Sequence, residues 1–316
     1  MDISPFKLKP TYKDYIWGGN KLKKLFGKKS GGKIAESWEL SCHPDGQSVI
    51  ADGPHKGKTL LEFLTACGQP PVPFLIKLID ASDNLSVQVH PDDDYARIHE
   101  NDSGKTEMWY VLEADESAFI FLGFNREMSR EALKNRVESN EITDVLCRKK
   151  VTRGDVIFIP AGTIHAIGKG VVLAEVQQCS NATYRVYDFG RLGKDGNPRP
   201  LHLDKALDVT DYRAYKEPIF GAKVLSSEEN YVYVRLAKCD YFCVDKLSLK
   251  DEAAEFVFKR DKSKFGCLLC IDGAVALDCG GHSLALSKGE TAFFPASTKK
   301  ITVKGIGEVV ITYDGK

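Results

Sequence analysis

The sequence lacks net charge, long apolar runs and an even number of cysteines. Lys plus Arg number 44 and Asp plus Glu number 44 among 316 residues, so no overall field attracts nucleic acid or an anionic membrane. No apolar run approaches the roughly 20 residues that cross a bilayer, and the first residues, MDISPFKLKP, have no apolar signal-peptide core. The nine cysteines are scattered through apolar patterns, as is typical of reduced thiols. We therefore expect a cytoplasmic protein that binds neither nucleic acid nor membrane.

The sequence is rich in strand-forming stretches. At 43% hydrophobic residues, the chain can bury a substantial core in one to three domains. Stretches of strand formers bounded by turn residues cover residues 71–90, 107–124, 154–167, 171–177 and 231–313. Residues 125–146 lack Gly and Pro and carry apolar side chains at helical spacing, and further helix is expected near each junction. These patterns predict a mainly β protein with a helical block near its middle.

A weak internal repeat suggests two copies of one β unit. GDVIFIPAGTIH begins at Gly154 and GETAFFPASTKK begins at Gly289, and in both a glycine is followed by five residues and then Pro-Ala. The spacing from a matching upstream strand is 42 residues in the first copy (Leu112 to Gly154) and 19 in the second (Cys270 to Gly289). The excess is close to the length of the helical block, so we predict that the first copy contains a helical insertion at about 125–146.

The two copies differ where chemistry would be expected. Five residues past the shared proline, the first copy has His165 and the second has Lys300, and Gly162 is replaced by Ser297. We therefore predict an N-terminal functional unit, residues 1–234 with the connecting segment, and a structural C-terminal unit, residues 235–316.

The stretch SVQVHPDD indicates a metal site. Gln88 and His90 are two residues apart, so their side chains point to the same face of a strand. An amide and an imidazole are unexpected neighbours on a core-facing strand, but they are possible metal ligands. The strand is expected to stop at Pro91.

The first copy resembles the cupin superfamily. Residues Gly154 to His165 fit G-x5-P-x-G-x2-H, which is similar to the second cupin motif. The resemblance implies small antiparallel barrels that hold a metal near one end. The first cupin motif usually supplies His-x-His and a Glu, and this chain offers Gln88-Val89-His90 followed by Glu107. The implied ligands are Gln88, His90, Glu107 and His165. Two imidazoles and a carboxylate suit zinc, so we expect one Zn²⁺ per chain.

Four motifs in order make the resemblance more specific. LSVQVHPDD, GKTEMWY, IPAGTIHAI and SNATYRVYDFGR resemble the type I mannose-6-phosphate isomerases in their short bacterial form, and the likeness runs from about residue 10 to the end. It implies two cupin barrels in tandem with a helical insertion. It also implies a cytoplasmic zinc enzyme that interconverts mannose 6-phosphate and fructose 6-phosphate, with a small phosphosugar as its partner.

Such an isomerase needs more than a metal. A proton moves between C1 and C2 through a cis-enediol, which requires a general base that is not bound to the metal. The candidates in matching motifs are Glu175, Glu36 and Lys105, and the choice between them stays open. Arg185, whose guanidinium is always charged, suits developing oxyanion charge. Alternatively, Arg185 forms a structural ion pair with Asp188.

Two further side chains are implied to bind substrate. Lys77 and Ser86 resemble residues that line the family's pocket and could help to bind the phosphate. Two other functions fit part of this pattern, a metal-dependent dioxygenase and a non-catalytic sugar-binding cupin. The set of Gln, Glu and two His differs from the usual 2-His-1-carboxylate iron site, which favours the isomerase. We expect a monomer or a weak homodimer.

Overall fold

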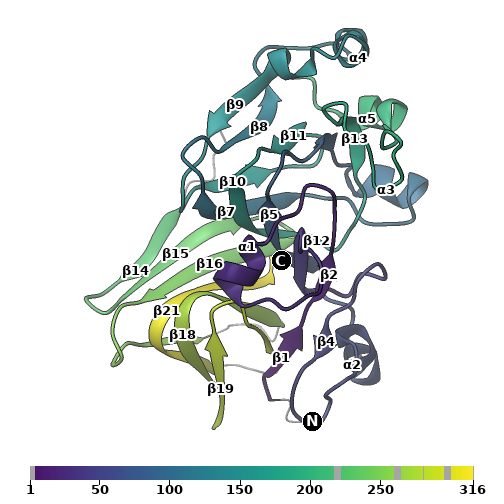
Figure 1. Ribbon diagram of the computed structural model, residues 1–316. Helices are drawn as coiled ribbons and strands as arrows, with labels where there is room; N and C mark the ends of the chain where they lie inside the picture. Colours follow the sequence, from purple (N-terminus) through teal and green to yellow (C-terminus); the bar gives the residue numbers. More distant parts are fainter. Residues whose placement is uncertain (1–3, 217–221, 260–264, 280, 295–299, 316) are drawn as a thin grey trace.

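The computed structural model describes residues 4–216, 222–259, 265–279, 281–294 and 300–315. The protein is mainly β, as predicted. In Figure 1 the strands form two bodies: one carries α3 (Asp93–His99), α4 (Arg130–Glu138) and α5 (Leu203–Val209), and the other contains most of the C-terminal strands. Within these residues the structure also has α1 (Lys21–Phe26) and α2 (Leu60–Ala66). No helix in the described residues is long and apolar enough to cross a membrane.

Two sheets build the first body. The six-stranded sheet has the order β10 (Val156–Ile159), β7 (Glu107–Ala114), β12 (Val171–Gln178), β5 (Phe74–Ala81), β3 (Glu36–Leu40) and β2 (Thr11–Lys13). The five-stranded sheet has the order β13 (Tyr184–Tyr187), β6 (Val87–Val89), β11 (His165–Ile167), β8 (Phe119–Phe124) and β9 (Leu146–Lys150). Side chains from both sheets, including Trp109, Leu122 and Leu173, form one apolar cluster. This cluster is the core of the first body.

The second body is a ten-stranded sheet. Its main order is β14 (Lys223–Ser227), β15 (Tyr231–Lys238), β16 (Phe242–Leu249), β21 (Lys300–Asp314), β18 (Gly266–Cys279), β20 (Thr291–Phe294), β1 (Phe6–Lys9) and β4 (Val49–Ile50). β17 (Glu255–Lys259) pairs with β21, and β19 (His282–Ser287) pairs with β18. This sheet therefore combines both ends of the chain. The expected boundary between residues 234 and 235 falls inside β15, and the division into two domains stays a prediction.

The pairing pattern repeats between the two bodies. β12 lies between β5 and β7, and β21 lies between β16 and β18. The helical segment predicted at 125–146 contains α4 and a short 3₁₀ helix, Ile142–Val145, between β8 and β9. Lys300, the expected counterpart of His165, begins β21 and is exposed, whereas Ser297 lies outside the described residues.

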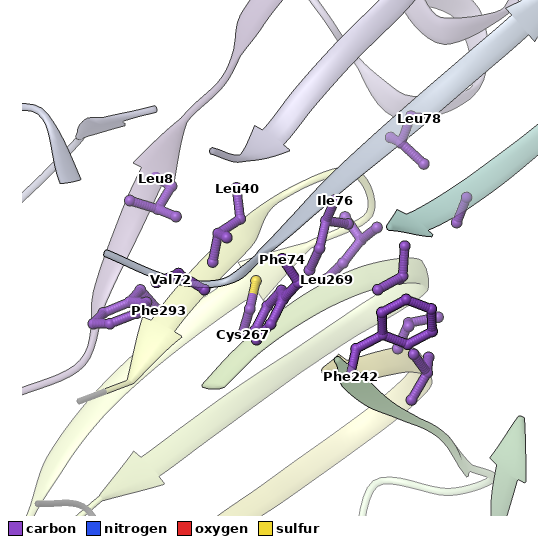
Figure 2. Packing of buried hydrophobic residues seen from close by; sticks show 14 of the residues in the cluster. Leu8, Leu40, Val72, Phe74, Ile76, Leu78, Phe242, Cys267, Leu269 and Phe293 are labelled. Carbon is purple, nitrogen blue, oxygen red and sulfur yellow. The ribbon is translucent and has the colours of Figure 1, made fainter. Parts of the chain in front are cut away.

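A second apolar cluster joins the two bodies. Figure 2 shows side chains of the six-stranded sheet, such as Leu40 and Ile76, packed with Phe242, Leu269 and Phe293 of the ten-stranded sheet. Burial of this apolar surface stabilises the contact between the bodies.

A buried polar bridge crosses the same interface. The Lys28 ammonium contacts Glu39 Oε1 at 2.5 Å and donates to the Gly289 carbonyl at 2.6 Å, while the Thr291 hydroxyl donates to Glu39 Oε2 at 2.9 Å. These contacts satisfy two buried charges, which would otherwise be costly.

Candidate metal centre and active site

Three strands bring the predicted metal ligands together. Gln88 on β6 lies directly opposite His165 on β11, and Glu107 begins β7. His90 directly follows β6, and its carbonyl accepts a hydrogen bond from the backbone N–H of Gly162 at 2.9 Å. Gly162 adopts φ +85°, a conformation that favours glycine, which explains the glycine in this motif. The loop before β11 is thereby tied to the end of β6.

His90, Glu107 and His165 form a tight buried cluster. One ligand atom from each lies within 4.8 Å of the others, and all three side chains are buried. The Nε2 atom of His90 is 3.4 Å from Glu107 Oε2, and the Nε2 atom of His165 is 3.3 Å from Glu107 Oε1. The two imidazoles therefore face one carboxylate from two sides.

Backbone carbonyls fix the orientation of both imidazoles. His90 Nδ1 lies 2.9 Å from the Ala182 carbonyl oxygen, and His165 Nδ1 lies 2.9 Å from the Thr163 carbonyl oxygen. A carbonyl only accepts, so each Nδ1 carries the proton and each Nε2 presents a lone pair toward Glu107. Burial lowers the pKa of His165 to about 4, and burial together with Lys105 holds that of His90 well below its usual range. Both rings are therefore neutral at pH 7.

This arrangement fits a metal ion. Glu107 Oε1 is buried without a hydrogen-bond partner among the described residues, and it faces the His165 lone pair. Two lone pairs that face each other are favourable only when a cation lies between them. Gln88 Nε2 is 3.3 Å from His165 Nε2, and a half-turn of this amide brings its oxygen to the same position. The four predicted residues can thus supply two imidazole nitrogens and two oxygens.

Lys105 contacts the same cluster. Its ammonium lies 2.6 Å from Glu107 Oε2 and 2.8 Å from His90 Nε2. It also lines the neighbouring pocket. Lys105 is therefore the charged side chain that connects the ligand cluster to the space where a substrate would bind.

A pocket of about 270 Å³ opens beside the cluster. It collects every candidate that the sequence placed near a substrate, as well as the metal-ligand candidate on β6: Glu36, Lys77, Ser86, Gln88, Lys105, Glu175 and Arg185. Residues that sequence reasoning missed also line it, namely Tyr15, Trp17, Asn181, Thr183 and Arg199 among others. The predicted side chains thus share one cavity.

Lys77 lies between two carboxylates on one wall. Its ammonium is 3.2 Å from Glu175 Oε1 and 3.7 Å from Glu36 Oε2. Burial lowers the pKa of Lys77, but the two carboxylates outweigh it and raise the pKa above its usual value. Burial raises the pKa of Glu175, but Lys77 and Lys105 lower it by more. The pKa of Glu175 is therefore below its usual value. Lys77 and Glu175 are therefore both charged at neutral pH.

Two indole groups hold these carboxylates. Trp38 Nε1 donates to Glu36 Oε2 at 2.6 Å, and Trp109 Nε1 donates to Glu175 Oε2 at 2.9 Å. Sequence reasoning missed both tryptophans. The spacing of Glu36 and Trp38, two residues apart on one strand, was an available signal. No signal in the sequence indicated the contact between Trp109 and Glu175, because the two residues are far apart in the chain.

Two arginines, Arg185 and Arg199, also line the pocket. Arg185 donates from Nη1 to the Pro200 carbonyl at 2.7 Å, and its Nε is buried without a hydrogen-bond partner among the described residues. The alternative pairing of Arg185 with Asp188 is wrong as a hydrogen-bonded ion pair, because the Asp188 carboxylate is bound by Arg191 and Arg199 instead. The Arg185 guanidinium therefore keeps a free donor beside the pocket.

Comparisons with known proteins agree with this architecture. Residues 5–119 match the family described as phosphomannose isomerase type I, catalytic domain, and residues 233–314 match mannose-6-phosphate isomerase, cupin domain. The chain is 37% identical over 319 residues to the probable mannose-6-phosphate isomerase GmuF of Bacillus subtilis, covering 98% of this chain and 99% of that protein. It is 34% identical to the mannose-6-phosphate isomerase ManA of the same species over 99% of this chain and 100% of ManA.

A solved structure shares the whole fold. The crystal structure of the mannose 6-phosphate isomerase from Bacillus subtilis aligns with a TM-score of 0.91 at 34% identity, over 98% of this chain and 99% of that one. The fold and the buried His–Glu–His cluster thus define a protein of the cupin type with a preformed pocket. The chain belongs to the type I mannose-6-phosphate isomerase family, and it is an enzyme of that family. The predicted resemblance is confirmed, and the non-catalytic and dioxygenase alternatives are not supported.

Proposed function

We propose that the protein interconverts mannose 6-phosphate and fructose 6-phosphate through a cis-enediol, with one Zn²⁺ per chain. The observation that carries this proposal is the shared pocket, in which candidate bases and cations lie beside the buried His–Glu–His cluster. The names of the full-length relatives support the choice of substrate. A cytoplasmic location and a monomeric or weakly dimeric state stay predictions from the sequence.

The proposed zinc ligands are Gln88, His90, Glu107 and His165. When bound, Zn²⁺ supplies Lewis-acid stabilisation of negative charge on the substrate oxygens. Glu107 is the only carboxylate of the set, and the imidazoles of His90 and His165 are neutral, so the site keeps a formal surplus of one positive charge. The Ala182 and Thr163 carbonyls hold the two imidazole rings in the orientation that ligation needs.

Three pocket side chains are candidates for the general base that moves the proton. Glu175 is charged and held by Trp109 and Lys77. Glu36 is held by Trp38 and lies on the other side of the same lysine. Lys105 contacts the metal-ligand cluster directly. We keep all three as candidates.

The remaining roles concern charge and recognition. We assign Arg185 to oxyanion stabilisation, because its buried Nε has no partner among the described residues. We assign Lys77 and Ser86, which line the pocket, to substrate contacts. The predicted contact between Lys77 and the phosphate stays a prediction, and the two carboxylates beside Lys77 leave it little free charge.

The proposed function is tested by following mannose 6-phosphate labelled with deuterium at C2, by NMR in water, with the zinc-loaded protein. We expect fructose 6-phosphate to form, with part of the label moved to C1 and part lost to solvent, because the carried proton can exchange on the base. Chelation should stop the reaction and added zinc should restore it. Absence of turnover by protein that holds zinc would contradict the proposed substrate. Label that stays on the sugar through many forward and reverse turnovers would point to hydride transfer and count against the cis-enediol.

A further inference from the structure

Two arginines hold one buried carboxylate beside the pocket, and a third arginine lies close by. Arg199 donates from Nε to Asp188 Oδ2 at 2.7 Å and also contacts Oδ1 through Nη2. Arg191 donates from Nη2 to Asp188 Oδ1 at 2.6 Å. Arg185 does not bind this carboxylate but is held by the carbonyl of Pro200, the residue after Arg199. Only Arg185 and Arg199 of these three line the pocket.

The two arginines give their wall of the pocket an excess of positive charge. The carboxylates that line the pocket, Glu36 and Glu175, both lie beside Lys77 on strands of the six-stranded sheet. Asp188 is shared between Arg191 and Arg199, so it cannot neutralise both. Burial and the nearby Arg199 lower the pKa of Arg185, which is the effect that one cation has on a close second cation. This wall is therefore suited to an anion.

We propose that Arg199 binds the phosphate group of the sugar phosphate substrate, and that Asp188 holds its guanidinium in place for this contact. The inference rests on the proposed function for the identity of the ligand. Asp188 occupies Nε and Nη2, which leaves Nη1 of Arg199 for a ligand, among the residues that the structure describes. A phosphate monoester carries close to two negative charges and offers several acceptor oxygens, which a guanidinium binds well.

The two arginines of the pocket suit different ends of a hexose 6-phosphate. Arg185 lies directly opposite Gln88 in the β13–β6 ladder, so it is the arginine beside the proposed metal. Arg199 is carried by the loop after β13, outside this ladder and next in sequence to Pro200, whose carbonyl accepts from Arg185. The carbons that react are C1 and C2, and the phosphate is at C6. Arg185 therefore suits the reacting end of the sugar and Arg199 its phosphate end.

The loop that carries Arg199 is anchored across the pocket. Leu192 pairs with Pro198 in an isolated bridge, and Lys194 in this hairpin contacts the Asp14 carboxylate at 2.8 Å. Asp14 directly precedes Tyr15, which lines the pocket. These contacts position Arg199 before substrate arrives, which lowers the entropy that binding has to overcome.

The first test measures binding of inorganic phosphate by isothermal titration calorimetry to the wild type, Arg199→Gln and Arg191→Gln. Each substitution removes one of the two guanidinium groups that contact the Asp188 carboxylate, but of the two arginines only Arg199 lines the pocket. We expect Arg199→Gln to weaken phosphate binding about tenfold to a hundredfold, and Arg191→Gln to weaken it by less than about threefold. Equal affinities of the wild type and Arg199→Gln, or equal losses in both variants, would overturn the inference.

The second test uses steady-state kinetics. Phosphate is charged in the ground state and the transition state alike, so Arg199→Gln should raise KM for mannose 6-phosphate about tenfold to a hundredfold with little change in kcat. Arg199→Lys, which keeps the charge, should recover part of the loss. A fall in kcat at unchanged KM would overturn the inference. A different result is also informative: the wild type does not turn over mannose 6-phosphate, yet it binds phosphate and Arg199→Gln does not. In that case the proposed function would fail and the anion site would stand.

Discussion

Lys77 and Glu175 lie directly opposite each other in the antiparallel ladder between β5 and β12, with Nζ and Oε1 3.2 Å apart. Further along the same inward-facing rows lie apolar side chains such as Ile79 and Leu173, which belong to the core of the first body. Every second side chain of β5 and β12 thus points into the barrel, where apolar groups fill one end and the charged pair lies toward the other. The pocket begins where the core ends.

The first prediction concerns this pair. Lys77→Met should lower the free energy of unfolding by about 3–5 kcal/mol, because it leaves the carboxylates of Glu36 and Glu175 buried without their shared cation. Urea unfolding followed by circular dichroism measures this. The double variant Lys77→Met/Glu175→Gln should cost less than the sum of the two single substitutions. Additive costs would show that the two side chains do not interact.

The second prediction concerns Arg185. Arg185→Ala should lower kcat strongly with little change in KM, because the charge that Arg185 stabilises develops mainly in the transition state. Arg185→Lys keeps the charge but removes the fork of donors, and it should still lower kcat about tenfold to a hundredfold. Steady-state kinetics with mannose 6-phosphate decide this. If Arg185→Lys behaved like the wild type, the oxyanion role would be mistaken.

The third prediction is that the C-terminal strands are structural. Lys300 begins β21 at the surface, and an ammonium cannot ligate a divalent metal. Lys300→Ala should leave kcat unchanged and alter the free energy of unfolding by no more than about 0.5 kcal/mol. Kinetics and urea unfolding of this variant provide the check. A lower kcat at unchanged stability, or a second metal bound per chain, would contradict it.

The fourth prediction concerns pH. Burial raises the pKa of Asp188, but the hydrogen bonds from Arg199 and Arg191 outweigh it and hold the pKa below its usual value. The pKa is lower in the folded state, so the stabilisation is fully present above the unfolded value of about 3.9 and is lost as pH falls through the folded pKa. Asp188→Asn should therefore cost about 1.5–3 kcal/mol at pH 7. This difference should shrink below about pH 4.

Unfolding in urea at pH 7 and at acidic pH measures this difference. A gap between the wild type and Asp188→Asn that stays constant with pH would contradict the role of the charged carboxylate.

Local patterns predicted much of the fold. Alternation and turn residues indicated the strands, and the unequal spacing of the repeat indicated the helical insertion that contains α4. The pairing of β1 with β20 on one side and with β4 on the other had no signal in the sequence, because β1 and β4 are short and β20 is far away in the chain. The burial of Lys28 against Glu39 was also unpredictable, since lysine is usually exposed.

Some residues of the site were likewise predictable from the sequence, and others were not. The two-residue spacing of Gln88 and His90 and the Gly-Pro motif before His165 are local, so the sequence indicated them directly. Glu107 followed from the resemblance. Arg199 lies in an irregular loop with no periodicity, and its place on the pocket depends on Asp188 and on the folded hairpin. Loop side chains of this kind are visible only in the folded chain.

The most direct test of the account is a parallel measurement of metal content and turnover of mannose 6-phosphate in the wild type, His90→Ala and His165→Ala. The wild type should hold one zinc per chain and interconvert mannose 6-phosphate and fructose 6-phosphate. Both variants should lose the metal and the activity but keep the circular dichroism of the folded protein, because the cores of both bodies are apolar. Full zinc stoichiometry in either variant, or undiminished turnover by metal-free wild type, would contradict the account.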